Sequence, residues 1–382
     1  MKKIILVAGA RPNFMKIAPL IHALNGNSSI KSVLVHTGQH YDMKMSGQFF
    51  DELNIPTPNI NLEVGSASHA VQTARIMEGF EKVCLDEKPD FVLVVGDVNS
   101  TAACTMVAAK LDEITTIHYE AGLRSHDRSM PEEINRLVTD AITDIFFTTS
   151  IDADENLLKE GVAKDKIFMV GNLMIDSLVA NLQKAEKTNL TFSLLNRNKK
   201  IIIEKNLCKS IQSVSSVCQY GVMTFHRPSN VDDEKSLKEL VRIWGKVSEK
   251  IPLIFSVHPR TYINIQKFGL QNEIDCHENL YFIEPLGYLQ FINLVQNAKF
   301  VLTDSGGVQE ETTYMNIPCL TVRQNTERPV TILEGSNKLI KTEDILSEVD
   351  LLLQGRGKTG SCPKFWDGNA AKRIVDIIEQ IC

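Results

Sequence analysis

Short apolar runs alternate with longer amphipathic stretches over most of this 382-residue chain, and this alternation limits the folds open to it. The first half predicts strands at 4–7, 33–36, 91–95, 116–119, 145–148 and 168–170, with helices between them. The apolar runs lack strict apolar–polar alternation, which is typical of strands buried on both faces of a parallel sheet. The order β-α-β-α therefore predicts an α/β fold with a doubly wound sheet.

The alternation stops between residues 187 and 219 and then starts again. Lysine-rich and serine-rich pieces fill this stretch, so we interpret it as a linker with an irregular excursion. Beyond it, strands are predicted at 221–225, 252–257, 280–283, 299–303 and 318–322. Because a domain averages roughly 150 residues, the chain length also favours two domains. We expect one Rossmann-like domain over 1–186, a second over 187–365, and a cleft between them.

Composition narrows the class of protein. Hydrophobic residues make up 43% and charged residues 23% of the chain, which is typical of a globular protein and excludes disordered or collagen-like chains. The net charge of −6 argues against a nucleic-acid partner. No two of the eight cysteines have C-x-x-C spacing, so no metal centre is predicted.

The N-terminus and the hydropathy profile predict a cytoplasmic protein. The apolar run at 4–8 is followed at once by Arg11, and is too short for a signal peptide. No run of 18 apolar residues occurs, so neither a transmembrane helix nor a membrane partner is expected.

Polar residues that follow strands are the candidates for function, because ligands of open α/β sheets bind at the carboxyl ends of strands. The segment 9–13 (GARPN) follows the first strand and lacks the G-x-G-x-x-G pattern of nicotinamide cofactor sites. Arg11 and Lys16 place two cations near a helix N-terminus, which suits a phosphate group. An ordinary surface loop is the alternative interpretation.

Acidic residues follow further strands of the first domain. Asp97 comes after the run VLVVG, Glu120 lies in YEAGLR, and Glu132 and Glu133 follow a proline at a predicted helix start. Each has a structural alternative, because Asp97 could cap a helix and acids in a first turn complement the helix dipole. Together, carboxylates at neighbouring strand ends suit proton transfer.

The second domain carries groups that suit an anion. His226 and Arg227 follow its first strand and His258 follows the next, although a histidine at a strand end is more often structural. The segment DSGGVQEE begins with small residues whose N–H groups can form an anion cradle at a helix start. Glu311, one turn further, can accept two hydrogen bonds from a ribose diol, and Arg328 adds a cation.

The motifs GARPNFMKIAPL, EAGLR, MPEEINR, DSGGVQEE and TERP occur in an order that resembles the non-hydrolysing UDP-N-acetylglucosamine 2-epimerases over nearly the full chain. The resemblance implies the two-domain glycosyltransferase-B fold, with the C-terminal helix at 366–382 packed back on the first domain. It also implies reversible epimerisation at C2 of UDP-N-acetylglucosamine, giving UDP-N-acetylmannosamine for surface polysaccharide precursors. In this chemistry UDP is eliminated to leave 2-acetamidoglucal and is then added back, without a cofactor.

The resemblance further implies roles for residues that match the family's motifs. The implied catalytic group is Asp97, Glu120, Glu132 and His226. The implied UDP-sugar contacts are Arg11, Lys16, Leu286, Phe291, Ser305, Gly306, Gly307, Glu311 and Arg328. A possible second, allosteric site matches Gln39, Arg75, Arg227 and His258, while Asp42 departs from the Glu or Gln common in its lining. Family members are often dimers, so a homodimer is expected.

Four other functions use similar features. A hydrolysing epimerase would add water instead of UDP, although the nearly intact EAGLR and H-R-P-x-N segments disfavour it. The same machinery would serve a modified UDP sugar, such as a 2,3-diacetamido uronic acid. A glycosyltransferase could share the fold, but would not need this number of carboxylates. A catalytically silent nucleotide-sugar sensor is the fourth alternative.

Overall fold

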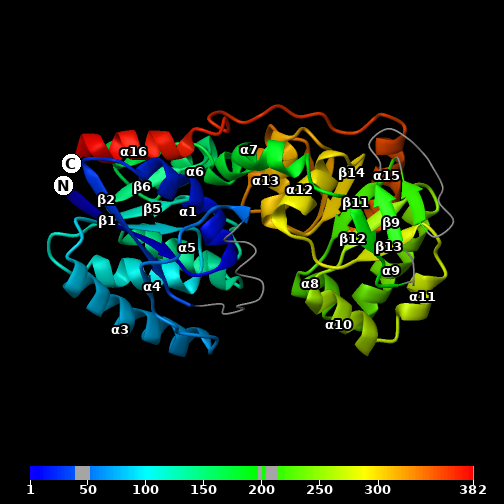
Figure 1. Cartoon of the computed structure of the whole chain (residues 1–382), viewed down its shortest axis with the longest axis horizontal. Helices are drawn as coiled ribbons and strands as arrows, with labels where there is room; N and C mark the ends of the chain where they lie inside the picture. The colour runs from blue at the N-terminus through cyan, green and yellow to red at the C-terminus, as the bar shows by residue number, and fades with distance from the viewer. Residues whose placement is uncertain (39–51, 197–199, 204–213, 218, 382) are drawn as a thin grey trace. The chain divides into compact units, whose positions relative to one another are not determined.

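The computed structural model describes residues 1–38, 52–196, 200–203, 214–217 and 219–381 (Figure 1). The chain divides into two compact units. The first unit comprises Met1–Ala180 together with Lys364–Cys382, and the second comprises Asn181–Pro363. Among the helices of the described part, none is both long and apolar enough to cross a membrane.

The first unit is built on one parallel sheet. Its strands are β1 (Lys2–Ala8), β2 (Ile30–His36), β3 (Ile60–Asn61), β4 (Phe91–Val95), β5 (Thr115–Tyr119), β6 (Ile145–Thr148) and β7 (Ile167–Met169). Its helices are α1 (Arg11–Leu24), α3 (His69–Glu87), α4 (Asn99–Ala108), α5 (Pro131–Ala141), α6 (Ile151–Lys159), η1 (Lys164–Lys166), α7 (Leu173–Ala185) and α16 (Ala370–Ile381). All strands pair in parallel in the order β3-β2-β1-β4-β5-β6-β7, which confirms the predicted doubly wound α/β class.

Burial on both faces explains why these apolar runs form central strands. Residues 4–8 of β1 are at most 2% exposed, and all five residues of β4 are buried. On one face, Val92 and Val94 of β4 pack in a cluster with Ile76 and Phe80 of α3. Removing apolar surface from water on both faces, at about 25 cal/mol per Å², stabilises this arrangement.

The C-terminal segment is anchored to the first unit by polar contacts. The carboxylate of Asp176 accepts hydrogen bonds from the backbone N–H groups of Ala370 and Ala371, at 3.1 and 2.7 Å. The indole N–H of Trp366 donates to the carbonyl of Thr149 at 2.9 Å. These contacts fix the start of α16, which packs against α1 (Figure 1).

The second unit is built on a second parallel sheet. Its strands are β8 (Thr191–Ser193), β9 (Lys200–Ile203), β10 (Val214–Val217), β11 (Gly221–Thr224), β12 (Leu253–Ser256), β13 (Leu280–Ile283), β14 (Phe300–Thr303), β15 (Cys319–Val322) and β16 (Asn337–Ile340). Its helices are α8 (Pro228–Val231), α9 (Glu234–Ser248), α10 (Pro259–Lys267), α11 (Gln271–Asp275), α12 (Tyr288–Gln296), α13 (Gly306–Tyr314), α14 (Pro329–Leu333), η2 (Thr342–Asp344) and α15 (Ile345–Leu353). The main sheet is parallel in the order β13-β12-β11-β14-β15-β16.

The interpretation of 187–219 as linker and irregular excursion is wrong for its described residues. Here β8, β9 and β10 form a three-stranded sheet, with β8 antiparallel to β9 and β10 parallel to it. Phe192 and Ile201 join a core cluster with Val222 of β11. The lysine-rich and serine-rich sequence around these short strands hid them. The strand β3 has only two residues, and β16 begins with Asn337 and Lys338, so neither shows a clear pattern in the sequence.

Candidate functional site

Each main sheet reverses its winding once, and such a reversal creates a crevice at the carboxyl ends of two neighbouring strands. In the first unit, β2 and β3 lie on one side of β1, while β4 to β7 lie on the other. In the second unit, β12 and β13 lie on one side of β11, while β14, β15 and β16 lie on the other. We call these two reversals, between β1 and β4 and between β11 and β14, the switch points. Most of the candidate residues of each unit follow the strands beside them.

A buried ion pair links α1 to the end of β5. Nζ of Lys16 lies 2.5 Å from Oε2 of Glu120, and the two side chains are only 7% and 3% exposed. Oε1 of Glu120 is also buried and has no hydrogen-bond partner among the described residues. A carboxylate with one open acceptor oxygen beside a cation suits a group that takes up a proton. The structure thus pairs a residue predicted to contact phosphate with one predicted to transfer protons.

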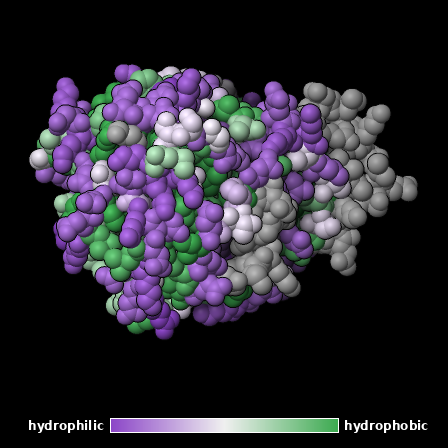
Figure 2. All heavy atoms as spheres, turned by 60° about the vertical axis from the view of Figure 1, so that its left-hand side comes forward, coloured by the Kyte–Doolittle hydropathy of each residue, from purple (hydrophilic) through white to green (hydrophobic). Residues whose placement is uncertain are grey.

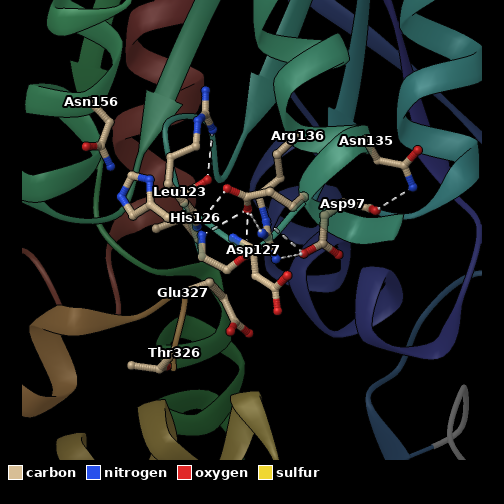
Figure 3. A network of polar contacts seen from close by, with 12 residues as sticks. Asp97, Leu123, His126, Asp127, Asn135, Arg136, Asn156, Thr326 and Glu327 are labelled. Atoms are coloured by element: carbon tan, nitrogen blue, oxygen red, sulfur yellow. Dashed lines mark hydrogen bonds and ion pairs between the residues drawn. The ribbon is translucent and has the colours of Figure 1, made fainter. Parts of the chain in front are cut away.

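Asp97 is held by an arginine from α5. Nε and Nη2 of Arg136 donate to Oδ2 of Asp97 at 3.1 and 2.7 Å (Figure 3). The arginine side chain is buried, whereas that of Asp97 remains 28% exposed. The residue that caps α4 is Val98, so helix capping does not explain Asp97. The fixed guanidinium orients one carboxylate oxygen and leaves the other for a further partner.

The neighbouring acids Glu132 and Glu133 have different surroundings. Glu133 is buried and accepts hydrogen bonds from the backbone N–H groups of Ser125 and His126, both at 2.9 Å, and from Arg136. Burial opposes its ionisation, but these donors outweigh burial and hold the pKa of Glu133 below its usual value. Glu132 is half-buried, and no described residue hydrogen-bonds or pairs with its carboxylate. Glu133 is therefore structural, and Glu132 is the acid that remains available.

A carboxylate at the second switch point organises the segment after β11. Asp304 is fully buried and accepts hydrogen bonds from the backbone N–H groups of His226 and Arg227, at 3.1 and 2.9 Å, and from the amide of Asn230. Nδ1 of His226 lies 3.1 Å from Oδ1 of the same carboxylate. Burial opposes ionisation, but the hydrogen bonds from His226, Asn230 and Arg227 keep the pKa of Asp304 below its usual value. This pairing places the proton of the His226 ring on Nδ1 and leaves Nε2 directed elsewhere.

His258 stacks on His226. Their ring centroids are 5.3 Å apart at an interplanar angle of 35°. Nδ1 of His258 accepts the backbone N–H of Arg260 at 3.2 Å, so its proton lies on Nε2. Burial and the neighbouring His226 lower the pKa of His258. Both histidines and the half-buried Arg227 therefore meet at one edge of the second sheet.

The predicted anion cradle lies at the start of α13. The segment 305–307 caps and begins this nine-residue helix. A Cβ added at Gly306 would lie 3.0 Å from Nη1 of Arg328 and 3.0 Å from Oε1 of Glu327, so the helix start lies directly against the arginine. Nε of Arg328 lies 2.9 Å from Oε1 of Glu310. Arg328 also pairs with Glu327, and the N–H of Ser305 donates to Oγ1 of Thr303 at 2.9 Å. The N–H groups of Gly306 and Gly307, the helix dipole and the guanidinium are the groups here that suit a phosphate.

The predicted ribose and base contacts lie near α12 and α13. Glu311 is only 5% exposed, and burial raises the pKa of its carboxyl group to about 8 despite a hydrogen bond from Tyr288. Leu286 and Phe291 are half-buried and pack against the core cluster that contains β11 and β14 residues. Their exposed faces offer an apolar surface of the kind on which a planar base can rest.

Some predicted site residues cannot be placed beside these. Arg75 lies on α3 in the first unit, where its side chain is exposed. Gln39 and Asp42 lie outside the described residues, and Arg11 begins α1 with a side chain outside the described part. Within the described ranges, no group of three His, Cys, Asp or Glu residues could hold a metal ion.

Sequence reasoning missed the residues that hold the candidates in place. Arg136 lies inside the motif MPEEINR and Asp304 directly precedes Ser305, so both were within segments already singled out. Their signal was a charged residue in an otherwise buried position, which requires a partner. His118, buried inside β5, carried the same signal.

Known proteins resemble this chain over its whole length. A family model described as UDP-N-acetylglucosamine 2-epimerase matches residues 22–379. A UDP-N-acetylglucosamine 2-epimerase of Methanococcus maripaludis is 42% identical, over 99% of this chain and 98% of its own. A UDP-2,3-diacetamido-2,3-dideoxy-D-glucuronate 2-epimerase of Pseudomonas aeruginosa is 34% identical, over 99% of this chain and 100% of its own.

Solved structures agree with these relatives. The crystal structure of Methanocaldococcus jannaschii UDP-GlcNAc 2-epimerase in complex with UDP-GlcNAc and UDP has a TM-score of 0.84 and 39% identity, and covers 100% of both chains. Its match extends through both units and the C-terminal helix. The resemblance found in the motifs is confirmed, and the chain belongs to the UDP-N-acetylglucosamine 2-epimerase family.

Proposed function

We propose that this protein interconverts UDP-N-acetylglucosamine and UDP-N-acetylmannosamine by elimination and re-addition of UDP. The observation that carries the proposal is the buried Glu120–Lys16 pair, with its open carboxylate oxygen, in a unit that also presents Asp97 and Glu132. Proton transfer at C2 needs groups of this type on each face of the sugar. Relatives that share this chain's full length bear the same activity in their names.

The nucleotide half of the substrate has its counterpart in the second unit. The hydroxyl of Ser305, the N–H groups of Gly306 and Gly307 and the guanidinium of Arg328 would bind the diphosphate, and Glu311 would accept hydrogen bonds from the ribose. The uracil would lie against Leu286 and Phe291. As the bond between C1 and the diphosphate oxygen breaks, these cations and N–H groups stabilise the charge that develops on UDP.

The proton steps fall to the first unit and His226. One carboxylate among Asp97, Glu120 and Glu132 removes the C2 proton while the C1–O bond breaks, which leaves 2-acetamidoglucal and UDP. A second acid then donates a proton to the opposite face of C2, and the diphosphate oxygen attacks C1 again. Lys16 and Arg136 keep two of these carboxylates oriented between the steps. When both ring nitrogens of His226 carry a proton, Nδ1–H would donate to Asp304 and Nε2–H would donate to the leaving diphosphate.

A different UDP sugar is the main alternative substrate for the same reaction. A modified UDP sugar, such as the diacetamido uronate, would require the same groups. The relative named for it is 34% identical to this chain, whereas two relatives named for UDP-N-acetylglucosamine are 42% and 40% identical. The second unit's groups address only UDP, so they suit either sugar. We therefore favour UDP-N-acetylglucosamine.

The test is proton NMR of purified protein with UDP-N-acetylglucosamine in deuterated water. UDP-N-acetylmannosamine carrying deuterium at C2 is the expected product. Free N-acetylmannosamine with accumulating UDP would instead identify a hydrolysing enzyme. If neither UDP-N-acetylglucosamine nor the diacetamido uronate changes, an enzymatic function of this kind is refuted. The D97N variant, which lacks one of the proposed catalytic carboxylates, serves as the inactive control.

We also propose a cytoplasmic homodimer. In support, the first unit has a pocket of about 570 Å³ with Met77 and Ile134 among its lining residues, and Val71 and Ile134 are exposed nearby on α3 and α5. Figure 2 shows apolar side chains scattered between hydrophilic ones on the face of this unit. Light scattering after size exclusion should give twice the mass of 42.7 kDa, and I134D should reduce it to the monomer.

The second, allosteric site stays a proposal. Arg227 and His258 lie together in the second unit, next to His226. Binding of UDP-N-acetylglucosamine there would make initial rates sigmoidal in substrate concentration. The variant R227A should then give a hyperbolic curve, because it removes the cation that this group of residues would offer to a diphosphate.

A further inference from the structure

A buried histidine sits behind the proposed proton-transfer groups. His118 lies in β5, two residues before Glu120, and its side chain is 0% exposed. Nδ1 lies 2.6 Å from Oδ1 of Asp140, and Nε2 lies 2.8 Å from the carbonyl oxygen of Gly96. Because the ring is fully enclosed, it cannot touch a substrate. Its role must be exerted through the two groups that it contacts.

The partners of His118 fix its protonation state. A carbonyl oxygen only accepts hydrogen bonds, so Nε2 must carry a proton. The carboxylate of Asp140 also accepts the backbone N–H of Gly122 at 3.0 Å and pairs with Nη2 of Arg124 at 2.7 Å. Burial opposes the ionisation of Asp140, but His118, Arg124 and Gly122 keep its pKa below the usual value. An ionised Asp140 is an acceptor as well, so Nδ1 must also carry a proton.

The charged groups around His118 are Asp140 from α5, Arg124, which pairs with Asp140, and Glu160, which accepts from Nε of Arg124 at 2.8 Å. The Glu160 side chain is 39% exposed, so water solvates its charge. The buried ionic pair next to the ring is therefore Asp140 with Arg124, and Arg124 holds the Asp140 carboxylate in place.

The His118 ring joins the two strand ends that carry the proposed catalytic carboxylates. Gly96 directly precedes Asp97, and its backbone N–H donates to the carbonyl of Tyr119, next to Glu120, at 3.1 Å. Gly96 has a φ of 69°, and a Cβ there would lie 3.3 Å from Nζ of Lys16 and 3.4 Å from Oε2 of Glu120. The turn that His118 holds is therefore in contact with the Lys16–Glu120 pair.

We infer that His118 is a positioning residue, which holds the Gly96 carbonyl and so keeps Asp97 and Glu120 in register for proton transfer at C2. This inference rests on the proposed function for its catalytic consequence. The hydrogen bonds of the ring, in which both nitrogens donate, do not depend on that function. The two parts can therefore be tested separately.

The hydrogen-bonding part is tested by ¹⁵N NMR of the histidine side chains in the full-length protein. H118N identifies the His118 signals by their loss. Because both partners of the ring are acceptors, we expect both ring nitrogens of His118 to show the shifts of nitrogens that carry a proton. A signal from an unprotonated ring nitrogen would overturn this part of the inference, whatever the protein catalyses.

The positioning part is tested by two variants that each retain one donor. The amide of H118N replaces the Nδ1–H group and keeps the bond to Asp140, whereas the amide of H118Q replaces Nε2–H and keeps the bond to Gly96. For H118N we expect kcat to fall about 100-fold, because the Asp97 turn is released, with KM changed by less than about twofold. H118Q should retain more of kcat than H118N, although it loses the contact to Asp140.

Matched controls separate positioning from stability. H22N makes the same change at an exposed histidine of α1, whose Nε2 lies 3.2 Å from the carbonyl oxygen of Leu53. It also removes a histidine hydrogen bond to a carbonyl, but away from the proposed site, so it should leave kcat and KM unchanged. The three proteins are compared at a temperature where circular dichroism shows each to be folded. A folded H118N with wild-type kcat, or an H118Q that loses as much as H118N, would refute the positioning role.

Discussion

Nζ of Lys16 and Oε2 of Glu120 lie 2.5 Å apart at the carboxyl edge of the first sheet, and both side chains are almost completely buried. Removing one partner of such a pair leaves an uncompensated buried charge, so K16M should lower the free energy of unfolding by about 3–5 kcal/mol. The double variant K16M/E120Q removes both charges, and should recover a large part of this loss. Urea denaturation of the four proteins measures the coupling. Additive losses would show that the pair does not form.

The same substitution should lower activity at Glu132 and stability at the adjacent Glu133. E132Q should lower kcat by roughly 10²–10⁴-fold with an unchanged free energy of unfolding, because Glu132 is available for proton transfer. E133Q should destabilise the protein by about 1–3 kcal/mol, because it breaks the bonds to Ser125, His126 and Arg136. Rate assays and urea denaturation of both variants check this division.

The contribution of Glu133 to stability also has a defined pH dependence. Its pKa is lowered in the folded protein, so its contribution is present above the unfolded value of 4.5 and is lost as the pH falls through the folded value. The gap in unfolding free energy between wild type and E133Q should therefore narrow in acid. A gap that is constant from neutral pH to acid would contradict this account.

Glu311 should show the opposite pH dependence. Burial raises its pKa from 4.5 to about 8, so its contribution is fully present below pH 4.5 and is lost as the pH rises through about 8. E311Q imitates the protonated side chain. The unfolding free energy of the wild type should therefore fall relative to that of E311Q between these two pH values. Chemical denaturation at several pH values measures the difference.

Nucleotide binding provides a second measurement on Glu311. A carboxylate that accepts two hydrogen bonds from a ribose must be ionised, so UDP binding near neutral pH should release a proton. The calorimetric enthalpy of UDP binding should then vary with the ionisation enthalpy of the buffer. This variation should disappear in E311Q. Equal enthalpies in all buffers for the wild type would contradict the proposed ribose contact.

Comparing alanine substitutions at Gly161 and Gly171 separates the cost of a positive φ from the cost of a steric clash. Gly171 and Gly161 have φ values of 95° and 93°. A Cβ at Gly171 would lie 2.1 Å from the carbonyl oxygen of Phe365, whereas a Cβ at Gly161 meets nothing within 4 Å. G161A should cost about 1–2 kcal/mol from strain alone. G171A should cost clearly more, because it displaces the segment that leads to α16, and limited proteolysis should release the C-terminus.

The sequence alone determined the fold class and the strands of both main sheets except the edge strands β3 and β16, because burial on both faces leaves a continuous apolar run that can be read locally. It also placed Asp97, Glu120 and the start of α13 correctly at strand ends, since each comes directly after such a run. The family followed from the order of the motifs, and the relatives agree with it.

The tertiary structure alone decided which of these residues are partners. Lys16 and Glu120 are 104 positions apart, and they meet because the sheet sets β4 between β1 and β5 with their carboxyl ends at one edge. Nothing local separates Glu132 from Glu133, because their difference arises from the backbone of 125–126, which folds against only one of them. The small sheet of β8, β9 and β10 was hidden by the lysine-rich and serine-rich sequence around its short strands, and only their packing against β11 makes them stable.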